Sequence, residues 1–141
     1  MLRALQEPDT GKFRVLAKQY VLERKKFFNQ LSSDDRKYLS FQLWQEGIAR
    51  YTQIKVAEAA AQYQPTTEYV ALSDFEPFST YAAKARAETL DELTRADLGQ
   101  WKRTAFYSFG AAEGLLLDRL KPQWKDEYFK NLLSMDSYFE N

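Results

Sequence analysis

Apolar side chains recur every three or four positions along most of this chain, which is the spacing of one face of an α-helix. The first such stretch predicts a helix from about Lys12 to Gln30. Ser32 and Asp35 then resemble a capping box, which predicts a second long helix from about Asp34 to Gln62. Pro65 ends this pattern, because proline lacks the backbone N–H that a helix interior needs.

The second half of the chain predicts three more helices. They run from about Ser79 to Ala96, from about Gln100 to Leu120 and from Pro122 to Leu132, where the proline suits a first helical turn. The apolar segment Tyr69–Leu72 is short and fits a helical turn as well as a strand. Segments of alternating polarity that would predict a β-sheet are not found.

The sequence also makes predictions for the two ends of the chain and for a close contact between helices. Residues 1–11 predict a flexible or extended N-terminal segment, and we expect Tyr138 and Phe139 in the C-terminal tail to pack on the protein. Gly110 and Gly114 lie inside a predicted helix, where each costs about 1 kcal/mol relative to alanine. We therefore expect another helix to approach closely there. The fold class predicted is all-α, a single domain over residues 1–141 built as a bundle of about five helices.

Composition supports a folded domain and removes several kinds of chemistry. The 141 residues are 45% hydrophobic and 16% aromatic, which is enough to build a core. The chain contains no histidine and no cysteine, so it offers no imidazole or thiolate ligand, no disulfide and no histidine-based triad. Its 20 basic and 20 acidic side chains give no net charge that would attract nucleic acid or a membrane.

The sequence also shows no targeting signal for a particular compartment. No apolar run is long enough for a signal peptide or a membrane span. We expect a soluble protein, cytoplasmic by default, and a periplasmic location stays open if a leader has been removed.

The segment Leu43–Tyr51 is the most informative motif in the chain. It combines Trp44, Glu46, Gly47 and Tyr51 at short spacing. This arrangement resembles the segment that carries the third metal ligand, a glutamate, in gluzincin-type zinc metallopeptidases. The later segment around Gly110 is similar to the helical C-terminal half of a bacterial peptidase-like family.

The resemblance implies that Glu46 stands at the position of the zinc-binding glutamate. In that superfamily a preceding helix supplies two histidines and the general base as His-Glu-x-x-His. One alignment of Phe13–Lys18 places Arg14 and Lys18 at the two histidine positions and Val15 at the base position. Neither protonated arginine nor lysine binds zinc, and valine cannot accept a proton. The resemblance therefore implies a vestigial site without cofactor, metal or catalytic residue, in which Glu46 pairs with Arg14 or Lys18.

Three functions remain open at this point. The first is a non-catalytic, degenerate or partial peptidase domain that acts by association with a protein partner or with itself, for example as a homodimer. The second is a part of a zinc-dependent peptidase whose His-Glu-x-x-His segment lies upstream in a longer chain. The third is a small module that binds nucleic acid or an acidic surface.

The third function rests on the basic run Arg24–Lys26, and we favour a solvated helix face over a nucleic-acid site there. The segment Glu58–Asp97 is correspondingly rich in acidic residues. Either intramolecular charge balance or head-to-tail self-association explains both segments.

Overall fold

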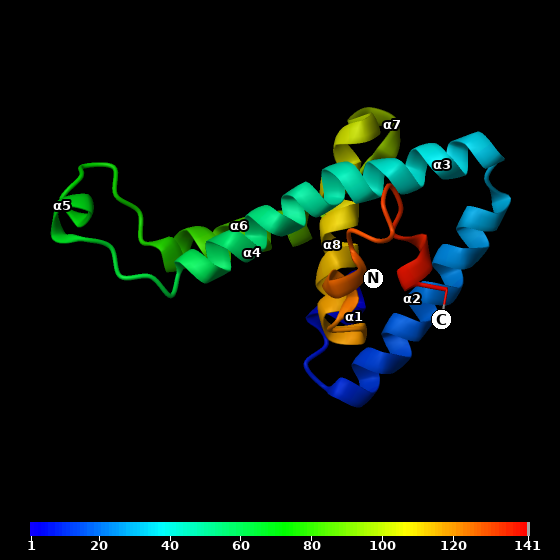
Figure 1. Cartoon of the computed structure of the whole chain (residues 1–141), viewed down its shortest axis with the longest axis horizontal. Helices are drawn as coiled ribbons and strands as arrows, with labels where there is room; N and C mark the ends of the chain where they lie inside the picture. Colours follow the sequence, from blue (N-terminus) through cyan, green and yellow to red (C-terminus); the bar gives the residue numbers. More distant parts are fainter. Residues whose placement is uncertain (141) are drawn as a thin grey trace.

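Helix α8 (Ala105–Leu120) runs through the middle of the molecule, and the other long helices pack around it (Figure 1). The computed structural model describes residues 1–140, and all regular secondary structure in that range is helical. Most residues of α8 are buried, including an unbroken run from Gly110 to Leu117. The predicted all-α bundle is confirmed.

A long helical rod crosses α8. It consists of α3 (Ser33–Gln42), a π-helical segment η1 (Leu43–Gly47) and α4 (Ile48–Ala60), so the predicted second helix is confirmed except for its central π-turn. The predicted cap is also present. The Ser32 hydroxyl accepts a hydrogen bond from the backbone N–H of Asp35 and donates one to the Asp35 carboxylate at 2.7 Å.

Helices α2 (Thr10–Gln30) and α6 (Phe78–Arg95) match the first and third predicted helices. Asp9 starts α2 by accepting a hydrogen bond from the backbone N–H of Lys12. Helix α6 packs along α4, and together they form an arm that extends away from α8 (Figure 1). Residues 61–77, with the short helix α5 (Thr67–Val70), form the end of this arm, which we call the arm tip.

The expectation for residues 1–11 was wrong, because Leu2–Gln6 form helix α1. Ala4 is only 1% exposed, and the Arg119 guanidinium donates hydrogen bonds to the carbonyl oxygens of Ala4 at 3.2 Å and Glu7 at 2.8 Å. A side chain distant in the sequence therefore satisfies the carbonyl groups at the end of this helix, which local pattern cannot reveal.

The predicted helix from Pro122 to Leu132 was also wrong. Only a 3₁₀ turn, η3 (Trp124–Glu127), forms there. Trp124 is 1% exposed, whereas Phe129 is 81% exposed, so the segment anchors itself through one ring instead of burying a continuous helix face.

The predicted helix from Gln100 to Leu120 is interrupted near its start. Helix α7 (Leu98–Trp101) is followed by the 3₁₀ turn η2 (Lys102–Thr104) before α8 begins. The break lies at Lys102, whose φ of 49° falls in the left-handed region.

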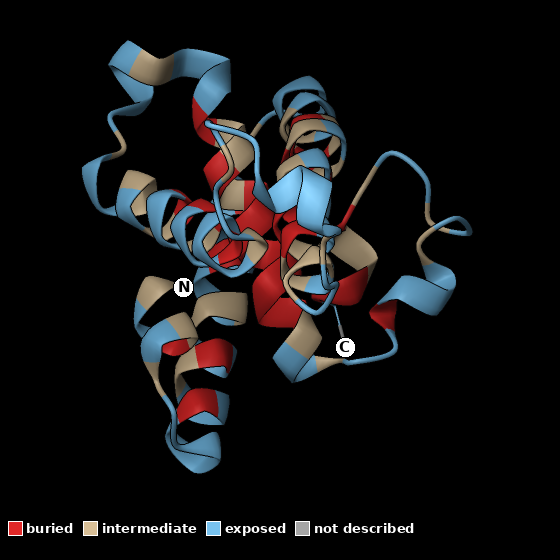
Figure 2. Cartoon of the chain, turned by 90° about the vertical axis from the view of Figure 1, so that its left-hand side faces the viewer, coloured by how far each residue is buried: buried red, intermediate tan, exposed pale blue. Residues whose placement is uncertain are grey.

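The hydrophobic core surrounds α8, as the buried residues in the centre of Figure 2 show. The tail ends in the 3₁₀ turn η4 (Asp136–Tyr138), and Tyr138 and Phe139 are buried as expected. In residues 1–140 no helix has the length and apolar character needed to cross a membrane.

Candidate functional site

The motif Leu43–Tyr51 crosses α8 at a point where two glycines face each other. A Cβ atom on Gly110 would lie 2.5 Å from the Cα of Gly47 and 2.5 Å from the carbonyl oxygen of Leu43. A Cβ atom on Gly47 would overlap the backbone of Gly110 in turn. The expected close helix approach is confirmed, and Gly47 is the glycine that completes it.

The aromatic residues of the motif hold the C-terminal segment. The ring of Trp44 stacks on that of Tyr128, with centroids 5.7 Å apart. The ring of Tyr51 packs edge-on against Trp124 at 5.5 Å and fills the space left by the missing side chain of Gly114. These motif residues therefore have a packing role in this fold.

A polar cluster lies beside the Tyr51 ring. Asp118 accepts hydrogen bonds from the Tyr51 hydroxyl at 2.7 Å, from Lys125 Nζ at 2.9 Å and from Trp124 Nε1 at 3.1 Å. Burial raises the pKa of Asp118, but these hydrogen bonds outweigh burial and lower the pKa below its ordinary value. The pKa of Tyr51 is raised, first by burial and then by the hydrogen bond to Asp118. Asp118 is therefore a charged anchor between α8 and the C-terminal segment.

Glu46 lies beside α8, near Tyr107. The pKa of Tyr107 is raised, chiefly by the nearby Glu46 carboxylate. Among residues 1–140 no ion pair joins Glu46 to Arg14 or Lys18, so the expected pairing was wrong. Both cations are exposed on α2, where they remain hydrated and have no buried charge to neutralise.

The carboxylate that meets the first long helix is Glu113, which is 2% exposed. It accepts hydrogen bonds from the Tyr20 hydroxyl at 2.6 Å and from Arg24 Nε at 2.6 Å. Tyr20 and Arg24 are four residues apart and so lie on one face of α2. Burial, followed by the charge of Glu113 and its hydrogen bond, raises the pKa of Tyr20 well above its ordinary value.

Sequence reasoning missed Glu113 because the segment around it was interpreted only through its glycines. A signal was present, since Glu113 is the one charged residue between Ala105 and Leu117. An ionisable group in such an apolar run needs a partner when it is buried. The predicted kind of contact, a cation of the first helix on a carboxylate, thus exists with different residues.

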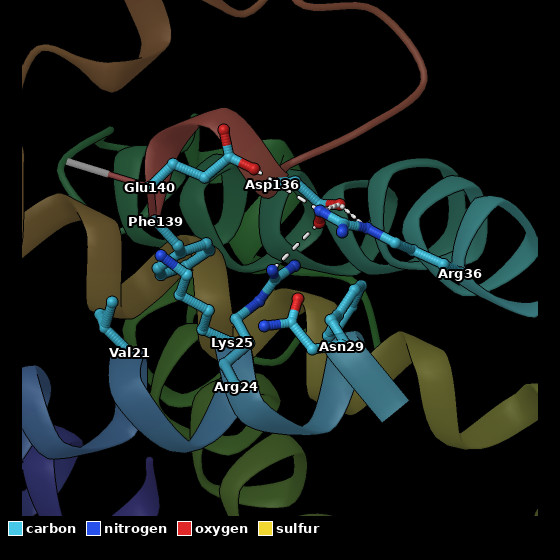
Figure 3. A pocket seen from close by; sticks show the side chains of 9 residues that line it. Val21, Arg24, Lys25, Asn29, Arg36, Asp136, Phe139 and Glu140 are labelled. Atoms are coloured by element: carbon cyan, nitrogen blue, oxygen red, sulfur yellow. Dashed lines mark hydrogen bonds and ion pairs between the residues drawn. The ribbon is translucent and has the colours of Figure 1, made fainter. Parts of the chain in front are cut away.

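Arg24 extends this network to the C-terminal tail. Its Nη1 lies 3.0 Å from Asp136 Oδ1, and its guanidinium lies over the rings of Phe28 and Phe139. Figure 3 shows Arg24 and Arg36 reaching Asp136 from two different helices. The interpretation of Arg24–Lys26 as a solvated face was therefore wrong for Arg24, which is 7% exposed.

An apolar cleft of about 810 Å³ opens beside Glu113, between α2, α3 and α8. Aromatic and aliphatic side chains make up most of its wall, and a few charged side chains also line it. The apolar wall includes Phe27, Phe28, Tyr38, Leu39, Leu43, Leu93, Leu98, Phe106 and Phe109.

The residues present do not fit a zinc site. The chain has no histidine or cysteine, and within residues 1–140 no three acidic side chains are grouped so that they could hold a metal ion. Arg14 and Lys18, at the aligned histidine positions, are exposed cations. Comparisons with models of known protein families, with curated proteins and with solved structures find no match for this chain.

Proposed function

We propose that this chain is a non-catalytic helical domain that acts through protein association, and that its partner is a second copy bound head to tail. The observation that carries the proposal is the arm tip, which combines exposed apolar side chains with unpaired acidic ones. Its complement is a basic and apolar strip on α2 at the other end of the molecule.

The arm tip exposes several large apolar side chains. Tyr63 is 64% exposed, Leu72 51% and Val70 47%. Contiguous exposed apolar side chains of this kind mark interaction surfaces. The segment 61–77 contains no lysine or arginine, and its acidic residues Glu68, Asp74 and Glu76 take part in no ion pair within the described residues.

The complementary strip lies on the outer face of α2. Val15 is 69% exposed and Leu22 52%, and they alternate with the cations Arg14, Lys18 and Lys25. Each of these residues has another of the set three or four positions away, so they share one broad helix face. None of the three cations takes part in an ion pair within the part of the chain that the structure describes.

The arm tip and α2 lie at opposite ends of the molecule (Figure 1). The acidic residues of the arm tip therefore cannot contact the cations of α2 within one molecule. Glu58, on the arm outside its tip, has a local partner instead, Arg86 at 2.8 Å. A second copy can bring its arm tip to α2. Such a head-to-tail contact uses two different surfaces and produces a ring or an open chain of molecules.

The association is tested by molar mass in solution as a function of concentration and salt. We expect the mass to rise with protein concentration and to fall as salt screens the ion pairs. Reversing charges with Arg14→Glu and Lys18→Glu should weaken association about tenfold, since exposed pairs are individually weak. Glu68→Lys together with Glu76→Lys should weaken it similarly, and the four changes combined should restore it.

A matched control reverses Lys84 and Lys130 to glutamate, because both lie outside the two surfaces. The proposal fails if the protein stays monomeric at every concentration or if the combined variant is not rescued. Salt-sensitive binding of duplex DNA or RNA that is lost with Arg14→Glu and Lys18→Glu would instead favour a nucleic-acid module.

A second candidate function is supported by the backbone at Glu46. This residue lies in the π-helical segment η1, and single π-turns inside helices occur frequently at functional sites. Glu46 would act as a carboxylate ligand to zinc held by histidines from another segment of a longer polypeptide. In such a polypeptide, Glu46→Gln should reduce the zinc content. Glu88→Gln is the control, because Glu88 is an exposed residue of α6, and it should leave the zinc content unchanged. Equal zinc content in both variants would remove this candidate.

A further inference from the structure

We propose that the apolar cleft between α2, α3 and α8 binds a single-chain amphiphile with an anionic head, and that this ligand is a long-chain fatty acid. The cleft lies apart from the arm tip, so the inference is independent of head-to-tail association. It rests on the length of the cleft, on the paired charges beside Glu113 and on the cations Lys102 and Arg103.

One wall of the cleft is a stripe along η2 and the first half of α8. The stripe runs from Lys102 and Arg103 through Phe106 and Phe109 to Glu113. At 1.5 Å per residue it is about 16 Å long, which is comparable with an extended acyl chain. The volume of about 810 Å³ lies in the range of small-molecule sites, about 300–1,000 Å³.

Beside Glu113, the side-chain charges that line the cleft already have partners within the described residues. Glu113 is buried and already accepts hydrogen bonds from Tyr20 and Arg24. Arg24 in turn contacts Asp136 at 3.0 Å. An anionic head beside Glu113 would lose hydration, would be repelled by that carboxylate and would find Arg24 already paired. The apolar tail of the ligand therefore occupies the part of the cleft beside Glu113.

The other end of the stripe attracts an anion. Lys102 and Arg103 are exposed, and within residues 1–140 neither takes part in an ion pair. Glu23, the other acidic residue that lines the cleft, is paired with Lys26 at 3.0 Å. A carboxylate head at Lys102 and Arg103 places the acyl chain along Phe106 and Phe109.

The experiment is calorimetric titration of the intact chain with palmitate below its micelle concentration. We expect one palmitate per chain and an affinity that falls about tenfold for every two carbons removed, because each buried methylene contributes a constant increment. Lys102→Glu combined with Arg103→Glu should weaken palmitate binding about tenfold. Hexadecanol, which has the same tail without the charge, should bind wild type and this double variant equally.

The control variant is again Lys84→Glu with Lys130→Glu, which changes net charge equally at positions outside the cleft. All the altered residues are exposed, and circular dichroism checks that each variant keeps the helical fold. The proposal is overturned if palmitate does not bind, if affinity is independent of chain length or if both double variants weaken it equally. Flotation with anionic phospholipid vesicles but no binding of free palmitate would also overturn it, because the acyl chain would then come from a membrane.

Discussion

Replacing Gly110 by alanine tests whether the contact between Gly47 and Gly110 sets the position of the central helix. The added methyl group would lie 2.5 Å from the Cα of Gly47 and 2.5 Å from the carbonyl oxygen of Leu43. Ordinary contacts between such atoms are about 3.5 Å, so the two helices would have to separate by about 1 Å. Both obstacles are backbone atoms, which cannot rotate away as a side chain can.

The expected loss of stability follows from two opposing effects. Forcing extra volume into a packed interior costs about 1–3 kcal/mol, and a backbone obstacle favours the upper end of that range. Alanine also improves helix propensity by about 1 kcal/mol relative to glycine. We therefore expect Gly110→Ala to lower the free energy of unfolding by about 2 kcal/mol. Gly11→Ala is the matched control, because its Cβ would meet only the Asp9 side chain at 3.3 Å.

The assay is urea unfolding followed by circular dichroism, with tryptophan fluorescence as a second probe. We expect Gly11→Ala to equal or exceed the wild type in stability. Gly47→Ala should resemble Gly110→Ala, and the double variant should lose less than the two losses added, because either methyl alone opens the crossing. Wild-type stability in Gly110→Ala, or strictly additive losses in the double variant, would refute the packing argument.

Two further predictions concern the buried charges. Arg24→Met should destabilise the fold by about 3–5 kcal/mol because it leaves Glu113 buried without its cation, and Arg24→Met with Glu113→Leu should recover part of this loss in the same urea assay. Burial raises the pKa of Asp118, but hydrogen bonds from Lys125 and Tyr51 lower it below 3.8, so its charged form stabilises the fold above the unfolded-state pKa. The stability advantage of wild type over Asp118→Asn should therefore be constant above about pH 5 and shrink as the pH falls through the lowered pKa of Asp118. An advantage that does not change on acidification would contradict the assigned hydrogen bonds.

The sequence predicted the long helices well because their information is local. Apolar spacing and the Ser32 cap define helices whatever lies around them. The failures have a common cause. Helix α1 depends on hydrogen bonds from Arg119, and the segment after Pro122 is held through the ring of Trp124, so both depend on distant residues. The candidate site failed similarly, since the choice between Glu46 and Glu113 depends on which carboxylate faces α2.

By itself, the sequence determined an all-α domain, a close approach at Gly110 and the absence of imidazole and thiolate chemistry. These follow from the helical periodicity, from the missing Cβ of Gly110 and from the composition, all of which can be read without knowing how the helices pack. Only the tertiary structure decided that Arg24 neutralises Glu113 and that the arm tip points away from α2. The physical reason is that burial and ion pairing depend on how helices cross, and that crossing is set by residues far apart in the chain.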